Sequence, residues 1–133
     1  MIRLCEIAFL SADKTRAIGI DLVNKEQILK YIRQSRRHKK KFEFIVELIL
    51  GGMKNTELYD KEDIDDRSKS IRAMKFFKGQ ENDRLYCKEQ RIGGVHCVII
   101  AEVYLKKKTK KNTKSIITII HKIADYEYEI QKH

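Results

Sequence analysis

A hairpin signal in the second half of the chain constrains the fold more than any other feature. Two apolar runs, 84–90 and 95–105, lie on either side of Gly93 and Gly94. Glycine tolerates the positive φ angles that a tight turn requires, so the two runs predict a pair of antiparallel strands. A third strand predicted over 70–77 extends this pair into a β-meander.

The strand predicted over 95–105 alternates in hydrophobicity and therefore has two different faces. The apolar face carries Val95, Cys97, Ile99, Ala101, Val103 and Leu105. The other face carries His96, Glu102, Tyr104 and Lys106. We expect the first face to build the core and the second to be available for chemistry.

Two stretches before the meander have helical periodicity. Asn24 followed by Gln27 matches an N-capping box, and the apolar residues after it predict a helix over about 25–36. A second helix is predicted to end at Gly51, a residue able to adopt the left-handed cap. Its apolar stripe comprises Phe42, Ile45, Val46 and Ile49.

The remaining stretches complete an α+β order. Residues 2–10 predict a first strand, and residues 11–22 fit either a second strand or a short helix. The acid-rich stretch 53–69 is predicted to be a loop or a short irregular helix. Isoleucines between 116 and 123 predict a final helix, which an acidic, aromatic tail over 125–130 follows. We expect a small antiparallel sheet flanked by an N-terminal helix pair and a C-terminal helix.

Length and composition predict one domain. A chain of 133 residues can bury one hydrophobic core, and 42% hydrophobic residues beside 36% charged residues are not typical of disorder. Within the single domain 1–133, the N-terminal strand and helix pair occupy about 1–52. The meander and the final helix occupy about 70–130.

Several classes of protein are disfavoured. The sequence has no apolar run of membrane-spanning length and no secretion-like start, so we expect a cytoplasmic protein without a membrane partner. Cys5, Cys87 and Cys97 have no close spacing and read as buried thiols in a reducing compartment. The four histidines show no ligand spacing, so neither a metal site nor a cofactor is expected.

The net charge of +10 is concentrated in two blocks. Residues 33–41 contain six Lys/Arg, residues 106–114 contain six lysines, and neither block contains an acid. The other 17 basic and 19 acidic residues sum to −2. Two such patches are what a polyanion such as RNA recognises.

The stretch 70–128 resembles the RelE/ParE toxin superfamily, and within it the HigB-like branch. A strand around MKFFKG leads to DRLYCKE, a strand with an early arginine. The long strand VIIAEVYL runs directly into KKKTKK, and a helix ends in IADYEYEI. The order and spacing of these pieces, over about half of the chain, carry the resemblance.

The resemblance implies a small sheet flanked by helices and a type II toxin that cleaves messenger RNA on the ribosome while a cognate antitoxin protein silences it. A noncatalytic RNA- or ribosome-binding module on the same scaffold is the alternative from another class. A gyrase-inhibiting ParE-like toxin is a third. The matching catalytic candidates are Arg84, Lys106, Lys107, Lys108, Lys110 and Tyr126.

The chemistry explains these residue types. Metal-independent cleavage deprotonates a 2′-OH, stabilises charge on phosphorus and protonates the leaving 5′-oxygen, and an arginine fork suits the phosphate oxygens. Crowded lysines can lower one another's pKa, or form a solvated loop that only binds phosphate. Tyr126 can stack on an RNA base or pack in the core. Glu102 can act as a general base that accepts a proton, or form an ion pair with a lysine. The RNA-binding candidates are Arg36, Arg37, Lys39, Lys40, Lys88, Arg91, Lys111 and Lys114.

Overall fold

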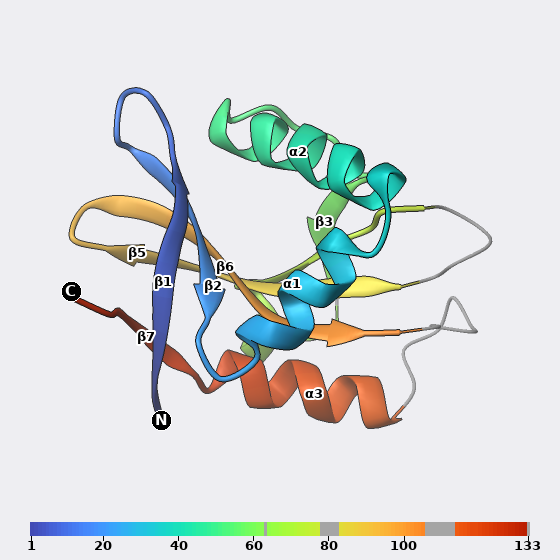
Figure 1. The fold of residues 1–133 in the computed structure, drawn as a ribbon. Coiled ribbons are helices and arrows are strands. Elements are labelled where there is room, and N and C mark those ends of the chain that lie inside the picture. Colours follow the sequence, from blue (N-terminus) through green and yellow to red (C-terminus); the bar gives the residue numbers. More distant parts are fainter. Residues whose placement is uncertain (63, 78–82, 106–113, 133) are drawn as a thin grey trace.

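The computed structural model describes residues 1–62, 64–77, 83–105 and 114–132 (Figure 1). Its helices are α1 (Lys25–Arg33), α2 (Arg36–Leu50), the 3-10 turn η1 (Asp66–Ser68) and α3 (Lys114–Ala124). Its strands are β1 (Ile2–Leu10), β2 (Arg16–Asp21), β3 (Tyr59–Lys61), β4 (Ile71–Met74), β5 (Arg84–Ile92), β6 (Val95–Tyr104) and β7 (Glu127–Ile130).

The described strands form one seven-stranded sheet in the order β3-β4-β5-β6-β2-β1-β7. The meander β4-β5-β6 is antiparallel as predicted, but β2 pairs with β6 in parallel and β7 pairs with β1 in parallel. The protein is α+β, as expected, and its sheet is mixed and larger than the small antiparallel sheet predicted. Residues 16–21, 59–61 and 127–130 make the difference, because all three segments are strands. The strand over 59–61 lies in the stretch 53–69, which was predicted to be a loop or a short irregular helix.

Helices cover both faces of this sheet (Figure 1). The core under α1 and α2 includes Val98 and Ile100 of β6, whereas the core under α3 includes Cys97 and Ile99 of the same strand. The prediction that only one face of this strand builds the core is therefore wrong. All three cysteines are buried and free, as predicted.

A β-bulge changes the alternation predicted for β6. Tyr86 pairs with Glu102 while Cys87 pairs with Ile100, so Ala101 is the extra residue. Beyond this bulge Tyr104 packs with Ala101 on the α3 face, and Val103 packs on the opposite face. A strict period of two cannot anticipate that shift.

The first helix begins at Lys25, as predicted, but it ends at Arg33, before the predicted end near residue 36. Asn24 makes no side-chain cap to α1, and its side-chain amide instead donates to the carbonyl of Ala101 at 2.8 Å. Ser35 has an extended backbone, and its hydroxyl accepts from the amide of His38, which caps α2. The second helix therefore begins at Arg36, well before the predicted apolar stripe.

A buried polar network ties the N-terminal strands to β7. The Asp21 carboxylate is fully buried and accepts from Nε and Nη2 of Arg3 at 2.9 and 3.1 Å. It also accepts from the Tyr128 hydroxyl at 2.6 Å. Burial and the Asp21 carboxylate together raise the pKa of Tyr128, which keeps this hydroxyl a donor.

Candidate nucleic-acid interface

One edge of the molecule collects the ends of elements that carry candidate residues. The start of α2, the start of β5, the end of β6 and the start of α3 lie on the right-hand side of Figure 1. Both termini lie on the opposite side. The candidates Lys106, Lys107, Lys108, Lys110 and Lys111 lie outside the described residues, whose flanking positions Leu105 and Lys114 are both exposed at this edge.

The basic block 33–41 occupies the α1–α2 junction and the first turns of α2. The predicted RNA-binding side chains of this block are exposed: Arg36, Arg37, Lys39 and Lys40. The first turn of α2 has no acidic residue, and none of the described carboxylates forms an ion pair with these four. Cations at the positive end of a helix dipole are unfavourable, so an anionic ligand would stabilise this surface.

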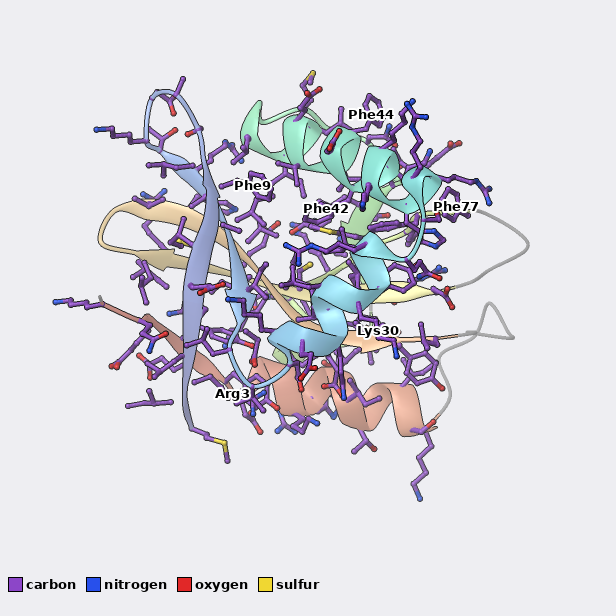
Figure 2. The ribbon with its side chains drawn as sticks, in the orientation of Figure 1. Arg3, Phe9, Lys30, Phe42, Phe44 and Phe77 are labelled. Carbon is purple, nitrogen blue, oxygen red and sulfur yellow. The ribbon has the colours of Figure 1, made fainter. Side chains whose placement is uncertain are left out.

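A hollow of about 400 Å³ lies on this basic surface and is lined by Arg37, Lys40, Lys41, Phe44 and Phe77. The Arg37 guanidinium lies over the Phe77 ring at 3.6 Å, and the Lys41 ammonium is 5.8 Å from the same ring centroid. Phe44 lies on the outer side of α2, away from the sheet (Figure 2). We call these five residues the basic–aromatic hollow.

Sequence reasoning missed both phenylalanines of the hollow. The signal was present, because Arg37, Lys40, Lys41 and Phe44 recur at i, i+3, i+4 and i+7 and so lie along one face of α2. The apolar stripe of the same helix faces the core instead. Phe77 reaches the hollow only through tertiary packing.

Arg84 begins β5 on the α3 face of the sheet, where it pairs with Tyr104 of β6. The guanidinium donates through Nη1 to the Asp83 carbonyl at 3.2 Å, and its Nε has no partner among the described residues. Next to it on the same face is Tyr86, fully buried, with a hydroxyl that also has no partner there. Within the described residues, Arg84 thus keeps its buried Nε without a partner, beside the buried ring of Tyr86.

The Tyr86 hydroxyl lies within the electrostatic influence of both Glu62 and Arg84. Burial raises the pKa of Tyr86, the negative charge of Glu62 raises it further, and the positive charge of Arg84 opposes both. Tyr86 therefore remains protonated near neutral pH.

Other predicted site residues are engaged in the structure. Lys88 donates to the carbonyls of Ala124, at 3.0 Å, and Tyr126 at the end of α3. Desolvation by burial lowers the pKa of Lys88. Glu102 forms an ion pair with Lys122 at 3.4 Å, the structural alternative to a general base.

Two candidates lie away from the basic edge. Tyr126 is buried, stacked under Arg3 at 4.2 Å, and follows the far end of α3. The 11 residues of α3 place it about 16 Å or more from Lys114. Arg91 donates to Gly94 in the β5–β6 turn, about 23 Å along β5 from Arg84. The structure does not bring either residue to Arg84.

A second polar cluster was not anticipated. The Glu89 carboxylate accepts from the Tyr59 hydroxyl at 2.5 Å, and it also contacts Arg72 Nε at 2.8 Å and His96 Nε2 at 3.3 Å. The side chains of Arg72, Glu89 and His96 are partly exposed. The other side chains of the cluster all contact Glu89, so the cluster has a structural role: it joins β3, β4, β5 and β6.

No family model, curated protein or solved structure matches this chain. Within the described ranges, no group of three or more His, Cys, Asp and Glu side chains could hold a metal ion. Among the same residues, no helix has the length and apolar character needed to span a membrane.

Proposed function

We propose that this protein binds RNA through the edge formed by the start of α2 and the start of β5. The observation that carries the proposal is the exposed basic block Arg36, Arg37, Lys39 and Lys40, which has no described acidic partner. Cations at a helix N-terminus that have no acidic partner among the described residues match a polyphosphate in charge and in the direction of the helix dipole.

We further propose that the protein cleaves the bound RNA without a metal, as a RelE/HigB-like messenger-RNA endonuclease toxin acting on the ribosome. In this reaction the 2′-oxygen loses its proton and attacks phosphorus, and the bond to the 5′-oxygen breaks as that oxygen gains a proton. Arg84 would stabilise the charge on the phosphate oxygens. The position of Arg84 at the basic edge, with an Nε that has no partner among the described residues, supports this assignment. The lysines 106–108 and 110 remain candidates for the proton transfers.

The partners follow from the same proposal. A toxin of this class acts in the cytoplasm and is held silent by a cognate antitoxin protein. A noncatalytic RNA- or ribosome-binding module is the second candidate, favoured by Tyr126, whose burial away from Arg84 removes one predicted catalytic group. Both candidates require the basic edge, and only the first requires Arg84 itself.

Mapping new RNA 5′ ends after induction of the protein in a bacterial host tests the cleavage directly. Cuts within translated regions that follow the reading frame are expected for a ribosome-dependent endonuclease. Intact messenger RNA together with ribosome association would instead establish the binding module. Growth arrest with DNA damage and no RNA cuts would contradict both.

RNA affinity should fall steeply with salt. Each phosphate contact releases a counterion, so four to six engaged cations imply a slope of about −3 to −4 in log binding constant against log salt. Fluorescence anisotropy with a labelled single strand measures this slope. Lys40→Ala should flatten it more than Lys54→Ala, which removes an exposed lysine just beyond the other end of α2. A slope near zero would exclude the electrostatic interface.

Cleavage should persist in a chelator. The proposed chemistry uses Arg84 and lysines, and the described part of the chain groups no metal ligands. Purified protein with ribosomes and messenger RNA, assayed after a brief EDTA treatment that leaves the ribosomes intact, measures this. Loss of cleavage that returns with added Mg²⁺ or Zn²⁺ at constant ribosome integrity would contradict the mechanism.

A further inference from the structure

We infer that the basic–aromatic hollow is a binding site for single-stranded RNA, in which a base stacks on Phe44 and the neighbouring phosphates contact Arg37, Lys40 and Lys41. This inference rests on the proposed RNA binding and adds the strand state and the contact that selects it. It does not depend on cleavage.

The exposed ring of Phe44 is the first observation. It is 48% exposed on a helix whose other phenylalanine, Phe42, is buried in the core. Phe44 lies one turn from Lys40 and Lys41 on the same face of α2. An exposed aromatic ring beside cations is an arrangement with which proteins bind unpaired bases.

The position of Arg37 is the second observation. Its guanidinium lies over the Phe77 ring at 3.6 Å, and the His38 ring also packs against Phe77 in a T-shaped arrangement, at 4.9 Å between centroids. This stacking reduces the freedom of a long side chain before any ligand binds. A phosphate that enters the hollow therefore meets an arginine that is already ordered.

The dimensions of the hollow fit a short segment of a strand. About 400 Å³ is within the range of small-molecule sites, and the hollow is open to solvent along α2. In a duplex the base faces are stacked on one another and are not available to Phe44. The aromatic ring therefore selects unpaired RNA, whereas the three cations alone would bind either form.

The test compares an unstructured RNA of about 12 nucleotides with the duplex it forms with its complement and with an abasic ribose-phosphate strand of equal length. Affinities are measured by anisotropy at one salt concentration. Phe44→Ala should weaken binding of the single strand about 5- to 100-fold, the loss of one stacked base. It should leave the duplex and the abasic strand almost unchanged, and Phe44→Tyr should retain the affinity of the wild type.

Val23→Ala is the matched control, because Val23 is an exposed apolar residue outside the hollow. Equal binding of the single strand by Phe44→Ala and the wild type, with binding still salt-dependent, would overturn the hollow and leave the proposed RNA binding intact. Failure of the wild type to bind any of the three RNAs would overturn the proposed function itself. The wild type could also bind a polyglutamate peptide more tightly than the single strand and lose this binding in Phe44→Ala. That result would show a protein-binding site and would also overturn the inference.

Discussion

Replacing Arg84 with alanine should lower the rate of RNA cleavage about 10²- to 10³-fold, which corresponds to about 3 to 4 kcal/mol of lost transition-state stabilisation. Arg84 lies at the start of β5 beside the buried ring of Tyr86, and its Nε has no partner among the described residues. A cation that the protein holds in position stabilises developing charge more strongly than one free in solution. Single-turnover cleavage of a ribosome-bound messenger measures the effect.

The substitution should leave the protein folded. Leu85 points into the core under α1 and α2 and Tyr86 into the core under α3, so truncating Arg84 between Asp83 and Leu85 removes no core side chain. Thermal unfolding of the variant checks this. Arg84→Lys keeps the charge and loses the planar fork, so it should recover binding more fully than cleavage.

Lysine variants provide the comparison that separates catalysis from binding. Lys114→Ala at the start of α3 removes an exposed cation on the same edge and should cost only a few-fold. Lys106→Ala, Lys107→Ala, Lys108→Ala and Lys110→Ala, measured one at a time, should give an uneven profile if one of them transfers a proton. Equal, small losses at Arg84 and at every lysine would contradict catalysis and support the binding module.

The central hairpin of the fold could be predicted because a local rule determines it. Gly93 and Gly94 both have positive φ, 56° and 80°, as the turn requires, and the register of β5 and β6 follows from that turn. β2 and β7 could not be placed in the same way. β2 forms a local hairpin with β1, but its parallel pairing with β6 and the parallel pairing of β7 with β1 join segments far apart in the sequence, which no local pattern specifies.

The candidate site was predictable in its charge and less so in its geometry. The position of Arg84 on the face shared with Tyr86 follows from the period of a strand, and the structure places both there. The hollow depends on the contact of Phe77 with Arg37, which joins the segment after β4 to α2 and which sequence spacing does not show. The pairing of Glu89 with His96 was within reach, because the two-residue turn puts them diagonally across the hairpin.

Asp21→Ala should lower the free energy of unfolding by about 3 to 5 kcal/mol, since it leaves a buried cation without its partner. The Asp21 side chain is fully buried, and that of Arg3 is only 15% exposed. The carboxylate also accepts from the Tyr128 hydroxyl and from the amide of Asn24, so one substitution releases contacts to β1, β7 and the start of α1. Urea unfolding followed by circular dichroism measures the loss.

Glu6→Ala is the matched control, because Glu6 lies on the same strand as Arg3 and pairs with Lys25 at 2.6 Å where both side chains reach solvent. An exposed pair of this kind contributes about 0 to 1 kcal/mol. Asp21→Ala combined with Arg3→Met should cost less than the sum of the single changes, since the double variant leaves no buried charge unpaired. A loss for Asp21→Ala no larger than for Glu6→Ala would show that the network does not hold β7 against β1. The two strands would then depend on their backbone hydrogen bonds and on the packing of Tyr128 under α3.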